Sequence, residues 1–518
     1  MTRRLRRAFA FAAVVLTVLS LREPSGRATS PIARLHALRA AEATIALDLD
    51  AARKELEGAD ATDPDVAIER GRLAIYEEDC DGAVLALSSP EVLRDEAGAA
   101  LADIARGCAR VTAATVTERD DARSIVVRFQ DEADRALMPL LVETIVKARD
   151  MLSRDLEVDW PKPTRVTVVR DLLSLSAMTG LPYESARTTG TVAVAKWGRV
   201  TLLSPRASRH GFAWRDTLTH ELTHLAVTRA TADRAPLWLQ EGVAKRQETR
   251  WRDPGPFDDR PSPDSIVLRG IELKLDLPLD KLGPSIAMLP SADAAMVAFA
   301  EVTSFVRFYA AAAGERALPK LFAELKGKRS PDDALTAASG AGLQAWDKKW
   351  RAWLAGRPRE TLSALFGLGE DPKALLELRE RSRLGELLLG RQHEGAALYE
   401  LDKVKASKLA ADDPHYRALR ARALEALGKG ADARAALGET SELQGSFAPW
   451  WAIRGRLLRA GSDAPGASGA FFEAVAADPF DPEAACETLD PTAVPADPGA
   501  AGLCRAARAK GDPPVGQD

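Results

Sequence analysis

The chain has 518 residues, which is enough for two to four domains with substantial hydrophobic cores. Hydrophobic residues make up 46% and charged residues 28% of the sequence, a composition typical of a soluble, helix-rich protein. The formal net charge is only -4 and no Lys/Arg-rich block follows the N-terminal MTRRLRR, which argues against a nucleic-acid partner.

The N-terminus joins the basic segment MTRRLRR to an uncharged apolar run from Ala8 to Leu21. This run is shorter than the roughly 20 apolar residues of a membrane-spanning helix and is typical of a secretion signal. Small residues suited to cleavage occur at Gly26–Ala28 and Ala28–Ser30. We therefore expect residues 1–30 to direct export to the periplasm or the exterior. No cysteine follows closely enough to carry a lipid, and an uncleaved N-terminal anchor is the alternative.

Two flanking regions, residues 31–115 and 357–518, are helical in period and share a spacing of small and large residues. Small residues at fixed offsets let one helix of a pair press closely on the other. The spacing, with a period of 34 residues, resembles tetratricopeptide repeats, which implies a protein partner; generic helical hairpins are the alternative. The matching sets, of which the second is two residues out of register, are Gly71, Ala74, Ala83 and Leu87; Gly385, Leu388, Ala397 and Leu401; Ala421, Leu424, Ala433 and Leu437; and Gly455, Leu458, Ala467 and Phe471.

The four cysteines form two local pairs, Cys80 with Cys108 and Cys486 with Cys504. Each pair is compatible with a disulfide that joins neighbouring helices or with two reduced, buried thiols. A CxxC motif is absent from the sequence, so we do not expect a cysteine zinc site or a thioredoxin-like centre.

Residues 116–356 mix strands with helices, so the fold class we expect is α+β, with a small mixed sheet between the helical regions. One helix is expected between the runs that begin at Val116 and Thr164. Further helices are expected from about Ala213, from Pro236 and, after a loop rich in proline and aspartate, from about Ala294. The predicted strands are VTERDDARSIVVRF from Val116, TRVTVVRD from Thr164, Thr191–Ala195 and Val200–Leu203, the last two joined by a turn at Trp197 and Gly198.

The helix expected from Ala213 carries the motif H-E-x-x-H, formed by His220, Glu221 and His224. Residues four apart project side by side from a helix, so the two imidazoles can converge on one metal ion. Glu221 lies beside them, where it can reach a metal-bound water rather than the metal itself.

A histidine pair could instead belong to the apolar face of the same helix. The helical wheel argues against this, because the apolar residues cluster within about 80° and the histidines lie about 140° from the centre of that cluster. The apolar residues are Trp214, Leu218, Leu222 and Leu225.

A hydrolytic zinc ion takes three protein ligands, and Glu241 in WLQEG is the natural third candidate. Two antiparallel helices joined by a short loop would bring Glu241 opposite the histidine pair, and the glycine after it would allow close packing on the first helix. A solvated surface carboxylate is the alternative for Glu241. The remaining histidines are poorer candidates because they lie outside this pair of helices: His36, His210, His393 and His415.

The segments THELTHL and PLWLQEGVA together resemble the gluzincin metallopeptidases, specifically the bacterial peptidase MA-like group. TTGTVAVAKWGRVTLLSP and AWDKKWRAWL are also similar to that group, and the resemblance extends over residues 116–356. It implies one zinc ion bound by His220, His224 and Glu241, with Glu221 as the catalytic acid and base. It further implies that strand Val200–Leu203 is a sheet edge along which an extended substrate lies.

The sequence departs from the group in two places. Related enzymes often carry an acidic residue one turn after the glutamate ligand to orient a ligand histidine, and that position is Lys245. They also often supply a tyrosine or histidine that stabilises the oxyanion. Here a position where the resemblance suggests tyrosine is Phe299, while Tyr183 and Tyr309 are the other candidates, so this donor is unassigned.

The sequence therefore predicts an exported zinc metallopeptidase that acts on a peptide or protein, with helical repeats that position the substrate or a partner. The alternative is a non-enzymatic peptide- or protein-binding module with a degenerate or structural zinc site. A third interpretation, a membrane-anchored assembly factor, depends on retention of the N-terminal apolar segment.

Overall fold

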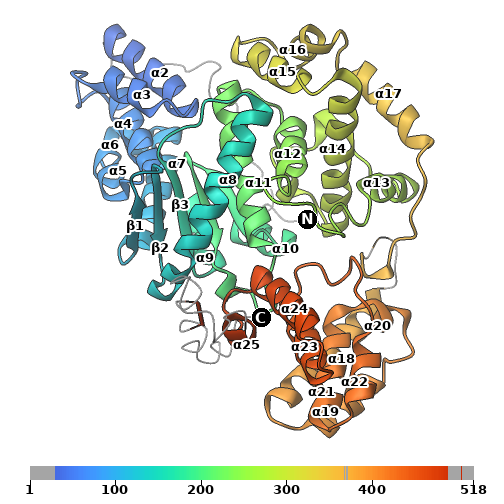
Figure 1. Ribbon diagram of the computed structural model, residues 1–518. Coiled ribbons are helices and arrows are strands. Elements are labelled where there is room, and N and C mark those ends of the chain that lie inside the picture. The colour runs from blue at the N-terminus through green and yellow to red at the C-terminus, as the bar shows by residue number, and fades with distance from the viewer. Residues whose placement is uncertain (1–29, 367, 369–371, 488–502, 505–518) are drawn as a thin grey trace, which may run out of the picture.

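The computed structural model describes residues 30–366, 368, 372–487 and 503–504. The predicted signal segment lies outside the described residues, apart from Ser30. Within the described part of the chain, the strands form one five-stranded sheet packed against helices, and the C-terminal helices lie to one side of it (Figure 1).

The sheet has the strand order β1-β2-β3-β5-β4 and mixes parallel with antiparallel pairs. The first predicted run divides into an antiparallel hairpin, β1 and β2, while β2, β3 and β5 are parallel neighbours. The strands are β1 (Val116–Asp120), β2 (Ile125–Phe129), β3 (Thr164–Val169), β4 (Ala193–Lys196) and β5 (Arg199–Leu203).

The prediction that Val200–Leu203 forms the sheet edge is wrong, because β5 is bonded on both sides and β4 is the edge. Trp197 and Gly198 connect the two strands in a tight turn in which both residues have positive φ, 56° and 70°. A two-residue turn of this kind folds the chain back antiparallel, so β4 pairs with the outer side of β5.

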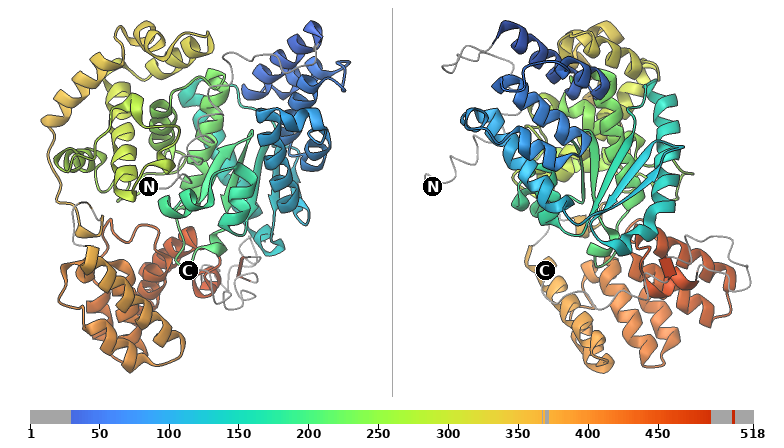
Figure 2. Two further views of the ribbon diagram at one scale, coloured as in Figure 1. Left: turned by 180° about the vertical axis from the view of Figure 1, so that it is seen from behind. Right: turned by 90° about the vertical axis from the view of Figure 1, so that its left-hand side faces the viewer.

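Helices cover both faces of the sheet, as the right-hand view in Figure 2 shows, with the N-terminal helices on one side and α8 on the other. Buried polar contacts join the N-terminal helices to the strands: Thr167 donates to Glu78, and the Arg199 guanidinium donates to the Ile75 carbonyl at 2.5 Å. The N-terminal helices and α8 to α11 are α2 (Pro31–Ile45), α3 (Leu49–Leu56), α4 (Pro64–Glu77), α5 (Cys80–Ala86), α6 (Pro90–Arg94), α7 (Glu96–Thr112), α8 (Met138–Leu156), α9 (Leu172–Thr179), α10 (Tyr183–Thr189) and α11 (Trp214–Thr231).

The helices after α11 extend the same hydrophobic core. Within the described residues, α14 alone is long and apolar enough to cross a membrane, but 72% of its apolar window is buried in the fold, as expected of a core helix. These helices are α12 (Leu237–Gln247), α13 (Pro263–Glu272), α14 (Ala292–Ala313), α15 (Ala317–Lys326), α16 (Pro331–Ser339) and α17 (Leu343–Ala355).

The C-terminal region consists of helical hairpins with hydrophobic clusters of their own, in the lower part of Figure 1. The predicted close approaches are present: a Cβ atom added to Gly455 would lie 2.7 Å from the Phe471 ring, and one on Gly385 would lie 2.9 Å from Leu401. The helices are α18 (Pro372–Gly390), α19 (Glu394–Asp402), α20 (Lys408–Asp412), α21 (Pro414–Ala426), α22 (Gly430–Leu437), α23 (Ala448–Ala460), α24 (Ala464–Ala477) and α25 (Pro482–Glu487).

Both local cysteine pairs are disulfide-bonded. Cys80 at the start of α5 is joined to Cys108 in α7, and Cys486 in α25 is joined to Cys504. Of the two states that the sequence allowed, the structure therefore has the oxidised one.

Candidate metal centre

Helix α11 presents two distinct faces. Trp214, Leu218 and Leu222 are fully buried, which confirms that they form the core face of the helix. The side chains of His220 and His224 retain 13% and 18% of their exposure and point toward α12. The histidines are therefore not members of the apolar stripe.

The turn after α11 brings α12 back alongside it (Figure 1). Ala232 and Asp233 adopt left-handed backbone conformations, which end α11, and Pro236 then caps the start of α12. Gly242 packs against α14 and not, as predicted, against α11: an added Cβ atom would lie 2.4 Å from Val306 Cγ2. The reason is that Glu241 already faces α11, and the next residue of a helix is rotated by about 100°.

Three ligand atoms meet between α11 and α12. The Nε2 atoms of His220 and His224 are 3.2 Å apart, and Glu241 Oε2 lies 3.5 Å from the first and 3.6 Å from the second. A tetrahedral zinc ion with bonds of 2.0–2.1 Å requires its ligand atoms to be roughly 3.3 Å apart. The two nitrogens and the carboxylate oxygen thus fit a single zinc ion with little movement.

The opposite nitrogen of each histidine has its own partner on α12 or at its C-terminal cap. His220 Nδ1 lies 3.2 Å from Glu248 Oε2, and His224 Nδ1 lies 3.3 Å from Gln240 Oε1. When Nδ1 carries the proton and donates to such an oxygen, Nε2 presents its lone pair to a metal. Glu248 and Gln240 therefore fix the histidines in the orientation and tautomer that a metal site needs.

Glu248 is a residue that sequence reasoning missed. The position one turn after Glu241 is indeed Lys245, but the orienting acid lies one turn further on, where seven residues return to almost the same face of the helix. Lys245 Nζ donates to both carboxylate oxygens of Glu248, at 2.8 and 2.9 Å. Lys245 thus holds the orienting carboxylate in place rather than replacing it.

The protein groups of this site carry more negative than positive charge. With both histidines neutral, as metal ligands are, the carboxylates of Glu221, Glu241 and Glu248 against one ammonium at Lys245 leave a formal charge of -2. Burial disfavours charge on His220, but its hydrogen bonds to Glu241 and Glu248 outweigh burial and raise its pKa to about 10. Metal binding and protonation compete for such a ring, and a divalent cation would neutralise the site.

Glu241 on α12 and Glu248 at its C-terminal cap remain ionised because positive charges lie beside them. Burial favours their neutral forms, but the charges of His224 and His220 lower the pKa of Glu241. Lys245 and His220 overcome burial at Glu248 and lower its pKa to about 2. Both carboxylates are therefore available as charged groups at any physiological pH.

Glu221 lies outside the ligand set and contacts the sheet edge. Its Oε2 accepts a hydrogen bond of 2.5 Å from the backbone N–H of Ala195 in β4. The side chain is largely buried, with 8% of its residue surface exposed. A carboxylate beside a metal position, held by a backbone donor of the edge strand, is suited to accept and return a proton.

The three oxyanion candidates lie in different environments. Tyr309 is fully buried, with its ring 5.0 Å from that of Trp346, which is a core position. Tyr183 is 37% exposed at the start of α10. Phe299 packs near the centre, since Lys245 Nζ lies 5.9 Å from its ring centroid, but it has no hydroxyl group to donate.

Residues 175–356 match the family model of the Peptidase MA superfamily, so the match includes α11, α12 and every residue of the centre. This superfamily is typically metal-dependent, and the match indicates a metallopeptidase-like domain. Comparison with curated proteins and with solved structures finds no match.

Proposed function

We propose that this chain is an exported zinc metallopeptidase of the gluzincin type, of the bacterial peptidase MA-like group, that hydrolyses peptide bonds. The observation that carries the proposal is the spacing of the His220, His224 and Glu241 donor atoms, which suits one zinc ion while Glu221 stays free of the ligand set. A purely structural zinc site has no need of that additional carboxylate.

A zinc ion at this position would polarise the substrate carbonyl and lower the pKa of a water molecule in its open position. Glu221, whose Oε2 is held by the Ala195 N–H, would accept the proton from that water on its carboxylate and deliver it to the departing amine. Glu248 and Gln240 hold the histidine rings, so that the ligands need no rearrangement during turnover.

An extended substrate would lie along β4, which replaces the strand first expected in this role. Val192 in the adjoining segment bonds to β5 through its carbonyl. Because backbone groups alternate along a strand, those of Ala193 and Ala195 face away from β5. Ala195 N–H orients Glu221, and the remaining outward groups of β4 can pair with a peptide strand.

The flanking helices would bind a protein partner or position the substrate as tetratricopeptide-like repeats. Support comes from the close helix contacts at Gly71, Gly385 and Gly455, which follow the predicted spacing. The two disulfides support export, because such bonds persist in oxidising compartments. We propose contact with a membrane only if the N-terminal apolar segment is retained.

The test compares wild-type protein with Glu221→Gln and His224→Ala. Zinc content is measured by mass spectrometry, and hydrolysis is measured on a broad peptide library with a chelator control. Glu221→Gln should retain zinc and lose hydrolysis by about 10²- to 10⁴-fold, because the base is removed and no ligand is changed. His224→Ala should lose this zinc ion together with activity.

Two results would contradict the proposal. Unchanged hydrolysis in Glu221→Gln would show that this carboxylate is not the base. Bound zinc in wild-type protein without any chelator-sensitive hydrolysis would favour the non-enzymatic binding module.

A further inference from the structure

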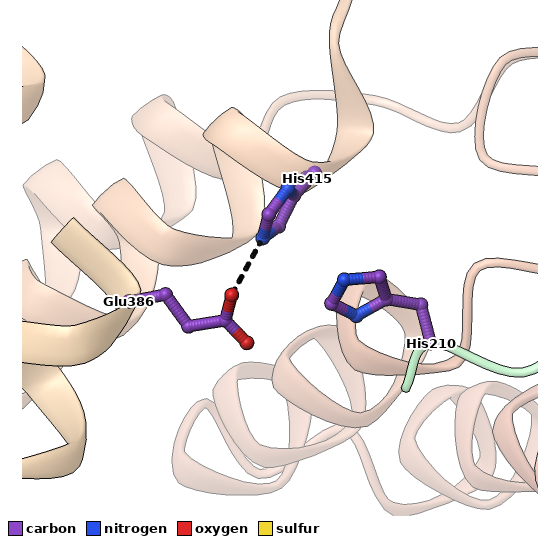
Figure 3. Close-up of side chains that lie close together, drawn as sticks. All are labelled: His210, Glu386 and His415. Atoms are coloured by element: carbon purple, nitrogen blue, oxygen red, sulfur yellow. Dashed lines mark ion pairs between the residues drawn. The ribbon is translucent and has the colours of Figure 1, made fainter. Parts of the chain in front are cut away.

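A second cluster of metal-ligating side chains lies between the sheet domain and the C-terminal helices. Figure 3 shows His210, Glu386 and His415 converging from three separate elements. His210 lies in the loop just before α11, Glu386 in α18 and His415 in α21. Sequence reasoning rejected both histidines as ligands of the first centre, and it did not bring them together.

The donor atoms are close enough to share an ion. One ligand atom from each residue lies within 4.8 Å of the others. His415 Nε2 is already 3.5 Å from Glu386 Oε2, near the roughly 3.3 Å that a tetrahedral zinc ion requires. Side-chain rotation would have to close the remaining separations by at most about 1.5 Å.

Two buried nitrogens of the cluster make no hydrogen bond to the described part of the chain. They are His210 Nδ1 and His415 Nε2, and the second has only the long ion-pair contact of 3.5 Å with Glu386 Oε2. A buried polar atom without a good hydrogen bond destabilises the folded state, so two such nitrogens in one cluster favour a bound ligand. A cation bound by both lone pairs would satisfy them at once.

The carboxylate of the cluster is held in the way a metal ligand often is. Arg209 Nε lies 3.1 Å from Glu386 Oε1, the oxygen that does not face His415. Such an outer contact fixes the carboxylate and leaves its second oxygen for an ion. A cavity of about 540 Å³ adjoins the three side chains, which gives room for an ion and its water ligands.

We propose that His210, Glu386 and His415 bind a second divalent transition-metal ion, with Zn²⁺ the best match to two imidazoles and one carboxylate. The inference is independent of the proposed peptidase activity. The ion would fasten the C-terminal helices to the loop that leads into α11. Two backbone bonds already join these parts: Ala448 N–H donates to the His210 carbonyl at 3.0 Å, and Phe212 N–H donates to the Ala477 carbonyl at 3.2 Å.

A competing explanation is aromatic packing without a metal. The rings of His210 and His415 lie 4.6 Å apart, and the Phe447 ring is 4.9 Å from the first and 5.6 Å from the second. Phe447→Leu therefore provides a matched control, because it removes an aromatic neighbour and leaves every proposed ligand in place.

The experiment measures zinc per chain in the full-length protein, purified as Glu221→Gln to prevent self-digestion and dialysed against micromolar zinc. We expect two equivalents in this background and in Phe447→Leu. His415→Ala and His224→Ala should each retain one equivalent, and the combination of both should retain none. A conservative Glu386→Gln variant should bind the second ion at least tenfold more weakly, since a neutral amide replaces a carboxylate.

A second measurement guards against misfolding of the variants. In His224→Ala only the proposed second ion remains, so a chelator should lower the thermal unfolding midpoint of this variant. The midpoint of the double variant His224→Ala/His415→Ala, which holds neither ion, should not change. One equivalent in the background, lost with His224→Ala and kept with His415→Ala, would overturn the second site and leave the first intact. Two equivalents retained in His415→Ala would overturn it as well, because the second ion would then be bound elsewhere.

Discussion

Gly242→Ala tests whether the close approach of α12 to α14 sets the position of Glu241. The added Cβ atom would lie 2.4 Å from Val306 Cγ2 and 2.6 Å from the Val302 carbonyl oxygen. Ordinary van der Waals contact begins near 3.4 Å, so the two helices must separate by about 1 Å. A displacement of that size at the neighbouring residue exceeds the roughly 0.5 Å that a metal site tolerates.

The expected cost is about 1–3 kcal/mol in the free energy of unfolding, the usual range for an overpacked core. Zinc affinity should fall at least tenfold, which corresponds to about 1.4 kcal/mol, although no ligand is changed. Urea unfolding of the metal-free protein measures the first quantity, and competition with a fluorescent chelator measures the second. The double variant Gly242→Ala/Val306→Ala should regain part of the unfolding free energy and part of the zinc affinity. The second substitution removes the clash with the Val306 side chain but leaves the contact with the Val302 carbonyl.

Gly469→Ala is the matched control. Gly469 is exposed within α24, and an added Cβ atom there meets nothing within 4 Å. The substitution should stabilise the protein by about 0.4–1 kcal/mol and leave zinc affinity unchanged. If Gly242→Ala were as stable as the wild type and bound zinc equally well, the packing of α12 on α14 would not position Glu241.

Three further predictions concern other sites. Glu248→Gln should weaken zinc binding about 10- to 100-fold in chelator competition, because the charged partner of a ligand histidine is lost; an unchanged affinity would remove Glu248 from the site. Burial raises the pKa of Glu301 to about 8 from an ordinary value near 4.5, so the native state keeps a proton there that the unfolded chain has lost. The stability that this proton contributes is lost as pH rises from about 5 to 9. The urea unfolding midpoint of Glu301→Gln should therefore fall less over that range than the midpoint of the wild type. An equal fall in the two proteins would contradict this prediction. The Cys80–Cys108 disulfide closes a loop with a sequence separation of 28 residues and so lowers the conformational entropy of the unfolded chain. Replacing both cysteines by alanine should therefore lower the free energy of unfolding by about 3–4 kcal/mol, and a change below about 1 kcal/mol would refute this reasoning.

The sequence predicted the parts of the first centre that depend on spacing within one helix. His220 and His224 lie four residues apart, so helical geometry alone separates them from the leucines of α11 and directs both rings toward one point. The same reasoning could have found Glu248, because it lies two helical turns after Glu241. Glu248 was missed because the orienting acid was expected only one turn after Glu241, where Lys245 stands.

The order of strands was less accessible from the sequence. Periodicity identified β4 and β5 and their turn, but it does not say which strand lies outside. That depends on pairing with β3, a strand more than twenty residues away in the chain. The edge of the sheet was therefore assigned to β5, whereas the structure has β4 at that edge.

The cluster of His210, Glu386 and His415 could not be predicted at all. Its members come from one loop and two helices, and no local spacing relates them. They meet only because the C-terminal hairpins fold back against the loop before α11. Tertiary packing creates this kind of site, and a motif search cannot detect it.

Two backbone hydrogen bonds connect the loop before α11 directly to the C-terminal helices. His210 and Phe212 are bonded to α23 and to the last residue of α24, and α11 begins at Trp214. If a protein bound these hairpins and shifted α23 or α24, we would expect a change of strain in the segment that leads into α11, the helix of the candidate metal centre. By whatever factor such a protein changed the affinity for a metal ion there, the metal ion would then change the affinity for the protein by the same factor.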